Sequence, residues 1–272
     1  MKKGKKLNRL VLDLILCVLG MLAGSVTVHA SYSVNIPVNK TITSLDFNGD
    51  GKKDKFKAYN YDRMEGKITF ALNGKKKSIF VARGTAINYC KFSNKQIYLF
   101  VYMHLFGGGE MTVYRYKGNA LKEVKSFPSI FDRTIFDHVK GDYVYLKESP
   151  YHLNNISGLS PREGSTGISF IFRYKLNRQD RKFSLSSRYG TPEENNHMYY
   201  TGKRFTTSSS PKKIDKKGFT LSPNTWVTLK RVYVKPYKRN GYTFYEYYLQ
   251  IEQNGKTGWY KPNSSRTFSV SK

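Results

Sequence analysis

The sequence has little cysteine, few acidic residues and no long segment with helical periodicity. Its 272 residues include two cysteines, and 19 Asp and Glu face 47 Lys and Arg. So little cysteine excludes a disulfide-rich scaffold and a cysteine-rich zinc site. The net charge of +28 attracts polyanions in general and does not select one of them. The aromatic content of 15% excludes a disordered chain, because such chains lack the apolar residues that build a core.

Familiar catalytic motifs are also missing. The chain contains no H-E-x-x-H, no G-x-S-x-G and no phosphate-binding P-loop. Two polar pairs remain as candidate acid/base couples, His104 with Glu110 and Asp137 with His138. Polar residues at hairpin ends are usually solvated, so the sequence favours a non-catalytic protein and leaves an enzyme as the alternative. No nucleic-acid-binding motif accompanies the positive charge, so no specific nucleic acid is expected.

The first 30 residues have the three parts of a signal peptide. Basic residues precede an apolar run at 10–23, and small residues lead up to Ser31. The run is short for a membrane span and contains Asp13, so we expect cleavage, with a retained anchor as the alternative. Cleavage leaves 42 basic against 18 acidic residues, a net charge of +24, and Cys90 as the remaining cysteine. We therefore expect a secreted or cell-wall-associated protein of Gram-positive type, without a membrane span.

After residue 30, short alternating segments broken by Gly, Asn and Lys predict an all-β fold. In the clearest hairpin, apolar residues alternate over 68–72 before the tight turn Asn73-Gly74. Further strands are predicted at 96–105, 111–116, 142–148, 167–176, 225–234 and 243–253. Three strand clusters, 41–82, 85–127 and 133–190, are each roughly the size of a propeller blade, which has about 40–50 residues, the third being somewhat longer. Three blades do not close a typical propeller, so the expected domain is blade-like and only partly propeller-like.

A segment rich in Ser, Pro and Lys divides the chain. Residues 206–217 lack apolar periodicity and read as a linker. The sequence therefore predicts a β-rich domain at 31–205 and a second, small β domain at 218–272.

One loop gathers oxygen-bearing side chains at alternate positions. Residues 46–54 read "DFNGDGKKD", and Gly51 allows the sharp turn that such a loop needs. Hard oxygen ligands with three formal negative charges suit Ca²⁺ better than a transition metal. The predicted ligands are the side chains of Asp46, Asn48, Asp50 and Asp54 and the main-chain carbonyl of Lys52. A tight Asp/Asn/Gly turn without a metal is the alternative.

This loop resembles the calcium loop of FG-GAP and VCBS repeats, whose pattern is D-x-[DN]-x-D-G-x-x-D. The resemblance covers about 15 residues. It differs from an EF-hand, because Lys57 stands where that loop has a bidentate Glu. In the FG-GAP and VCBS families the loop joins strands of a propeller blade or a blade-like hairpin. The resemblance therefore implies a structural Ca²⁺ in the first domain.

The C-terminal segment resembles a bacterial Src-homology-3-like (SH3-like) domain. The resemblance rests on the strand at 225–234, the strand at 248–252 and the hairpin "NGKTGWYKP", which contains Gly258-Trp259. It implies a small β-barrel and binding to cell-wall components. We expect Trp259 itself to be a core aromatic residue packed behind the turn rather than a binding residue.

Cations and tyrosines alternate in "KRVYVKPYKRNGYTFYEYY", residues 230–248. Residues 211–272 carry 13 Lys and Arg against three acids, a net charge of +10. Such a pattern can hold a polyanion by charge with help from aromatic faces, and an ordinary solvated basic face is the alternative. The sequence thus predicts an exported, calcium-stabilised, non-catalytic protein that binds anionic cell-wall polymer or peptidoglycan. The alternative is a secreted hydrolase with an unrecognised site in the first domain.

Overall fold

The structure, a computed structural model, describes most of the chain after residue 29. The described residues are 30–62, 66–80, 85–105, 108–124, 133–149, 159–161, 169–177, 179, 182–193, 198–201, 204–213, 215, 217–262 and 268–270. All of the regular secondary structure in these ranges is β-strand, so the predicted fold class is confirmed. The predicted signal peptide lies outside them, apart from Ala30. A search of the described ranges for a helix able to cross a membrane found none.

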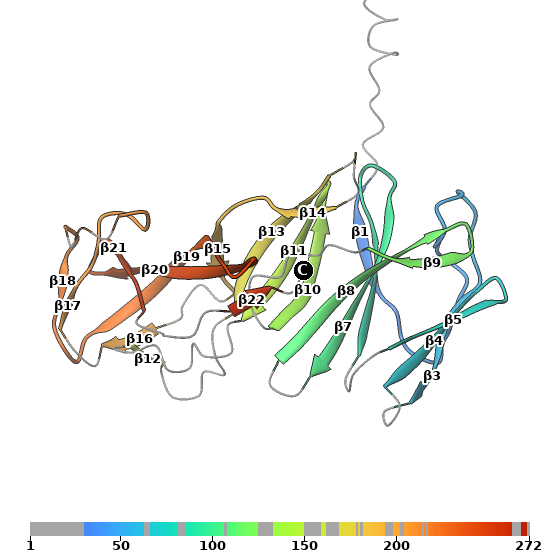
Figure 1. Cartoon of the computed structure of the whole chain (residues 1–272), viewed down its shortest axis with the longest axis horizontal. Coiled ribbons are helices and arrows are strands. Elements are labelled where there is room, and N and C mark those ends of the chain that lie inside the picture. The colour runs from blue at the N-terminus through green and yellow to red at the C-terminus, as the bar shows by residue number, and fades with distance from the viewer. Residues whose placement is uncertain are drawn as a thin grey trace, which may run out of the picture. The chain divides into compact units, whose positions relative to one another are not determined.

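A four-stranded antiparallel sheet carries the acidic loop (Figure 1). Its strands, in spatial order, are β2 (Thr41–Ile42), β3 (Phe56–Asp62), β4 (Lys67–Leu72) and β5 (Lys75–Phe80). The turn between β4 and β5 is Asn73-Gly74, with φ angles of 49° and 85°. Positive φ at both central residues is the type I′ geometry that the Asn-Gly pair predicts. The acidic loop connects β2 to β3, as the FG-GAP resemblance implies for a loop between strands.

A second, larger sheet contains most of the other strands. Its first part follows the order β1, β6, β7, β8, β10, β11, β13. These strands and their two side branches are β1 (Tyr32–Asn35), β6 (Ala86–Lys91), β7 (Ile97–Leu105), β8 (Gly108–Lys117), β9 (Ala120–Glu123), β10 (Arg133–Lys140), β11 (Tyr143–Ser149), β13 (Phe170–Leu176) and β14 (Phe183–Leu185). The pairings are antiparallel except for one parallel contact between β8 and β10.

The sheet continues through β15 into the C-terminal strands, in the order β15, β19, β16, β12. The remaining strands are β12 (Leu159–Pro161), β15 (Tyr189–Pro192), β16 (Met198–Thr201), β17 (Phe205–Thr206), β18 (Thr220–Leu221), β19 (Trp226–Arg239), β20 (Tyr242–Gln253), β21 (Lys256–Tyr260) and β22 (Phe268–Val270). Strands β17 and β18 form a sheet of their own. Within the described ranges no sheet closes into a barrel, which fits a partial, blade-like arrangement. The SH3-like assignment stays a prediction.

Residues around the predicted linker pair with the C-terminal strands. Ser208 forms a β-bridge with Trp259, and β17 pairs with β18. Upstream of the linker, β15 and β16 both pair with β19. The division at 206–217 stays a prediction, but strands from before it share a sheet with strands from after it.

Alternating apolar residues build the two main cores. One lies between the four-stranded sheet and β6–β8, and Phe47, Phe56, Phe70 and Tyr89 are buried in it. The other includes buried residues from β6 through to β21. Burial of these aromatic and aliphatic side chains drives the packing of the strands. The acidic loop contributes Phe47 to the first core, so the loop is packed against this core.

Candidate functional site

The acidic loop wraps tightly around the carboxylate of Asp46. Gly49 and Gly51 have φ angles of +80° and +88°, which residues with a side chain rarely adopt. Their backbone N–H groups therefore turn inward: Gly49 N donates to Asp46 Oδ1 at 2.6 Å and Gly51 N donates to Asp46 Oδ2 at 2.9 Å. The Asp46 carbonyl accepts a hydrogen bond from the Tyr89 hydroxyl at 2.8 Å, which anchors the start of the loop to β6.

Asn48 and Asp50 repeat this inward hydrogen bonding at the exposed tip. Asp50 N donates to Asn48 Oδ1 at 2.9 Å, and Lys52 N donates to Asp50 Oδ1 at 2.8 Å. The Lys52 N–H, followed by the Asn48 side chain, lowers the pKa of Asp50 below its ordinary value. These bonds favour the ionised carboxylate, so Asp50 carries its negative charge in the loop.

Asp54 is the buried member of the loop, with 4% of its surface exposed. Its Oδ2 accepts hydrogen bonds from Phe47 N at 2.7 Å and Asn48 N at 3.1 Å. Its Oδ1 accepts a hydrogen bond from Asn73 Nδ2 at 2.6 Å. Asn73 belongs to the β4–β5 turn, so Asp54 fastens the acidic loop to the neighbouring hairpin.

The donor chemistry of the loop fits Ca²⁺, although the side chains are arranged as a self-hydrogen-bonded turn. Asn48 Nδ2 lies between two carboxylates, 3.1 Å from Asp50 Oδ2 and 3.4 Å from Asp54 Oδ1. Rotation of the Asn48 amide would present an oxygen at this point in place of the amino group. Among the described residues, no three His, Cys, Asp or Glu side chains already converge as a metal group. The calcium site therefore stays a prediction.

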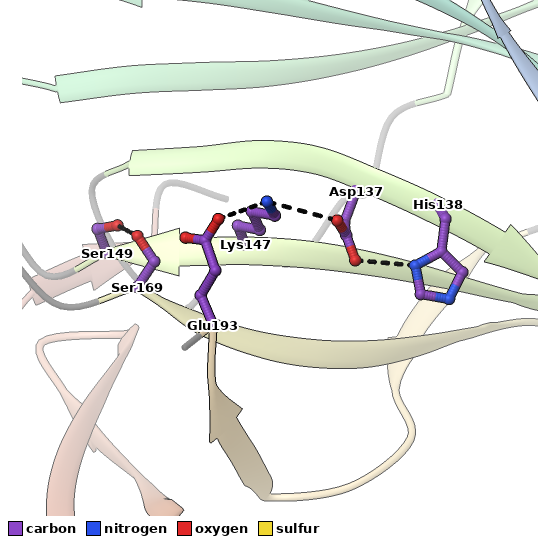
Figure 2. A network of polar contacts seen from close by, with 6 residues as sticks. All are labelled: Asp137, His138, Lys147, Ser149, Ser169 and Glu193. Carbon is purple, nitrogen blue, oxygen red and sulfur yellow. Dashed lines mark hydrogen bonds and ion pairs between the residues drawn. The ribbon is translucent and has the colours of Figure 1, made fainter. Parts of the chain in front are cut away.

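The candidate acid/base pairs lie elsewhere. The side chains of His104 and Glu110 lie outside the described residues. Asp137 and His138 are adjacent at a register shift in β10, and His138 Nδ1 is 2.8 Å from Asp137 Oδ2 (Figure 2). The His138 ring stacks on Tyr145 with centroids 4.2 Å apart.

Lys147 links Asp137 to Glu193. Its Nζ is 3.6 Å from Asp137 Oδ1 and 2.5 Å from Glu193 Oε1. The hydrogen bond that Lys147 donates to Glu193, together with the negative charges of Glu193 and Asp137, raises the pKa of Lys147, so Lys147 is a cation rather than a base. Figure 2 shows Ser149 and Ser169 at the other end of this network, hydrogen-bonded to each other at 2.6 Å. The geometry is that of a surface charge network that ties β10, β11 and the end of β15 together.

Glu148 is a buried carboxylate that the sequence analysis missed. It has no exposed surface and accepts a hydrogen bond from the Tyr174 hydroxyl. The signal was present in the alternation of β11, because Val144, Leu146 and Glu148 occupy every second position and share the inward face.

The basic segment at 230–248 forms one face of the β19–β20 hairpin. Directly paired residues share a face, and the register pairs Arg231 with Gln250, Tyr233 with Tyr248 and Tyr237 with Phe244. Strand β15 adds Tyr189 opposite Tyr233, and β21 adds Trp259 opposite Gln250. We call the following set the aromatic–cationic face: Tyr189, Arg231, Tyr233, Lys235, Tyr237, Arg239, Phe244, Tyr248, Trp259 and Lys261.

Aromatic rings form the floor of this face. Tyr189 lies 5.0 Å from Tyr233 and 6.0 Å from Trp259, measured between ring centroids. Tyr233, Tyr248 and Trp259 are buried together, whereas 39% of Tyr189 is exposed. Trp259 is thus a packed aromatic residue, as expected from the sequence, and Tyr189 is the ring that this cluster presents to solvent.

Cations surround the aromatic floor. Arg231, Lys235 and Arg239 are exposed at every fourth position of β19. Lys261 Nζ is 5.6 Å from the centroid of the Tyr248 ring and 2.9 Å from Glu246 Oε1. The hydrogen bond from Lys261 lowers the pKa of Glu246. The face therefore combines flat aromatic surface with an excess of positive charge.

No family model, no curated protein and no solved structure matches this chain. The resemblances to FG-GAP or VCBS repeats and to SH3-like domains therefore stay predictions.

Proposed function

We propose that this is an exported, non-catalytic protein of the cell envelope that binds anionic cell-wall polymer through its aromatic–cationic face. The observation that carries the proposal is the pairing of β19 with β20, which places Arg231, Lys235 and Arg239 on one face with aromatic rings between them. Export rests on the signal-peptide pattern of residues 1–30.

The spacing of the cations suits a chain of repeated negative charges. Residues four apart on a strand are separated by about 13 Å. Arg231, Lys235 and Arg239 therefore form a row of three positive charges at roughly regular intervals. The half-buried Tyr237 lies between Lys235 and Arg239 on the same strand face, and the exposed Tyr189 lies opposite the buried Tyr233, so aromatic surface is available beside the cations. A short anion would use one cation of this row, whereas a polymer would use them all.

Binding to purified cell walls tests the proposal. Because charge supplies most of the attraction, the protein should bind complete walls at low salt. It should be released at high salt and fail to bind walls from which the anionic polymer has been extracted. Equal binding in all four combinations of wall and salt would contradict the proposal.

Two triple variants distinguish wall binding by the aromatic–cationic face from wall binding by net charge alone. Replacing Arg231, Lys235 and Arg239 with Gln should weaken wall binding by about tenfold or more, equivalent to about 1.4 kcal/mol. The matched control replaces Lys212, Lys213 and Lys256 with Gln, which removes the same charge from exposed positions outside the face. Equal losses in the two variants would show that net charge alone binds the wall.

We propose a structural role for calcium in the same protein. Asp46, Asn48, Asp50 and Asp54, with the Lys52 carbonyl, would hold the ion, and its positive charge would offset the three carboxylates. Support comes from the two carboxylates that face Asn48 Nδ2 and from the inward wrapping at Gly49 and Gly51.

A further inference from the structure

A cavity lies beside the acidic loop, between that loop and two strands of the larger sheet. Its volume is about 230 Å³. The loop supplies Phe47, Asn48 and Gly49, and the other walls come from the turn before β7, from the start of β7 and from β8. These other lining residues are Lys95, Gln96, Ile97, Tyr98, Arg115 and Tyr116.

Two cations line this cavity, and the acids of the neighbouring loop do not. Among the residues that the structure describes, no carboxylate forms an ion pair with Lys95 or Arg115. Arg115 lies directly opposite Lys122 in the β8–β9 register, so its nearest cross-strand neighbour has the same charge. Asp46 and Asp54 direct their oxygens at the loop's own N–H groups. The lining therefore offers two unneutralised positive charges to a ligand.

The walls are held in place before any ligand arrives. Phe47 stacks on Phe56 at 4.2 Å and meets Tyr89 edge-on at 5.1 Å. The Tyr98 hydroxyl donates to Gln96 Oε1 at 2.8 Å, which fixes the Gln96 side chain. A preformed site binds more tightly than one that must be ordered on binding, because less conformational entropy is lost.

Size and chemistry together select the ligand. The volume is below the range of about 300–1,000 Å³ that encloses drug-sized ligands, so the cavity suits one small unit. The half-buried Ile97 and the 9% of Tyr116 that is exposed offer a small apolar surface to a carbon skeleton, and the buried Phe47 and Tyr98 support the walls. Two cations match a phosphate group, which carries about −1.5 to −2 charges at neutral pH, and the guanidinium fork of Arg115 suits its oxygens.

We propose that this cavity is a binding site for a small phosphorylated sugar or polyol, with Arg115 and Lys95 holding the phosphate. The site is separate from the aromatic–cationic face, and the inference does not rest on polymer binding there.

Calorimetric titration of the full chain with glycerol 3-phosphate and glucose 6-phosphate tests this site. Inorganic phosphate, glucose and glucuronate serve as the matched probes. The proposal expects the two phosphorylated compounds to bind more tightly than all three of these. Binding of inorganic phosphate or glucuronate at equal affinity would overturn the ligand class, and no heat from either phosphorylated compound at millimolar concentration would overturn the site.

Variants assign the binding to the cavity. Arg115→Gln and Lys95→Asn should each weaken binding by about tenfold. Asn is chosen at position 95 because the backbone there has a φ of +66°, which Asn tolerates. Lys122→Gln is the control, since it removes an adjacent charge that does not line the cavity. An equal loss in Lys122→Gln would overturn the assignment. If Arg115→Gln does not fold, Arg115→Lys keeps the charge without the fork and should still weaken binding.

Wall binding distinguishes this inference from the proposed function. Arg115→Gln should bind cell walls as the unaltered protein does, because it leaves the aromatic–cationic face intact. Loss of phosphate-ligand binding with normal wall binding supports the cavity site alone. Parallel loss of both in Arg115→Gln would overturn the separation of the two sites.

Discussion

The charged side chains of the acidic loop and those of the aromatic–cationic face lie in opposite environments. In the loop, Asp46, Asp50 and Asp54 each accept hydrogen bonds from N–H groups of the chain itself. On the face, Arg231, Lys235 and Arg239 are exposed at the surface of one strand. The acids of the loop are therefore bound into the fold, whereas the three cations of the face are exposed to solvent.

The difference has a simple physical cause. A buried carboxylate such as Asp54 is stable only when hydrogen bonds replace the water that it has lost. An exposed Lys or Arg keeps its hydration and needs no partner within the protein. If this comparison is right, changes in the loop alter stability, and changes on the face alter binding.

The largest effect is expected for Asp54→Ala. It leaves Phe47 N, Asn48 N and Asn73 Nδ2 without their buried acceptor, and each such loss costs about 1–3 kcal/mol. The free energy of unfolding in denaturant should fall by about 3 kcal/mol or more. Asp54→Asn, which keeps one acceptor oxygen, should cost less. A loss below about 1 kcal/mol in Asp54→Ala would contradict the role of Asp54 as the fastening of the loop.

Calcium should produce the next largest effect. Extracellular calcium modules bind with dissociation constants of about 10⁻⁴–10⁻³ M, so about 10 mM calcium should stabilise the protein by about 1.4–2.7 kcal/mol. Thermal melting should show a higher Tm with calcium, and Asp50→Ala should abolish the rise. Lys52→Ala is the control, because residue 52 is predicted to bind calcium through its main-chain carbonyl, which the substitution retains. A melting curve that calcium does not move would remove the calcium site.

A smaller effect, on wall binding rather than on stability, is expected for Tyr189→Ala. Its ring is 39% exposed and rests on Tyr233 and Trp259. Loss of an aromatic contact of about 1 kcal/mol should weaken wall binding about fivefold. The unfolding free energy should change little, and Tyr189→Phe, which keeps the ring, should bind nearly normally. A fall of several kcal/mol in the unfolding free energy of Tyr189→Ala, together with unchanged wall binding, would show that Tyr189 serves stability and not binding.

The smallest effect concerns Asp215, an acid that lies among the cations of the C-terminal part. The Ser209 hydroxyl, followed by the backbone N–H groups of Lys217 and Ser209, lowers the pKa of Asp215 to about 2. Because the folded pKa lies below the ordinary value of 3.8, the stabilisation is present above about pH 4 and is lost as the pH falls through about 2.

Melting at a series of pH values measures this contribution. The Tm difference between the unaltered protein and Asp215→Asn should be constant above about pH 4 and shrink toward pH 2. A Tm difference that does not depend on pH would show that the hydrogen bonds to the Asp215 carboxylate do not stabilise the fold as those of the acidic loop are expected to do.

Local features of the fold could be predicted from the sequence because they depend on neighbouring residues. Asn73-Gly74 and Asn254-Gly255 form the expected turns, with positive φ at all four residues. Asn240-Gly241 makes the same kind of turn and joins β19 to β20.

The candidate cavity could not be predicted in the same way. Phe47, Lys95 and Arg115 are far apart in the chain, and no local pattern connects them. They meet because the acidic loop packs its Phe47 into a core that β6–β8 complete. Likewise, the pairing of β15 with β19 brings Tyr189 into contact with Tyr233 and Trp259, and no spacing in the sequence predicts that contact.

Alternation, turn residues and the oxygen-bearing side chains of 46–54 were sufficient by themselves to determine an all-β chain with a tightly wrapped acidic loop. These features depend on the two-residue repeat of a strand and on the backbone freedom of Gly and Asn. Only the tertiary structure decided that Tyr189 is exposed beside the buried Trp259, and that Arg115 and Lys95 line one cavity. Burial and cavity formation depend on which distant strands pair and which faces become covered, and this is decided by the packing of the whole core.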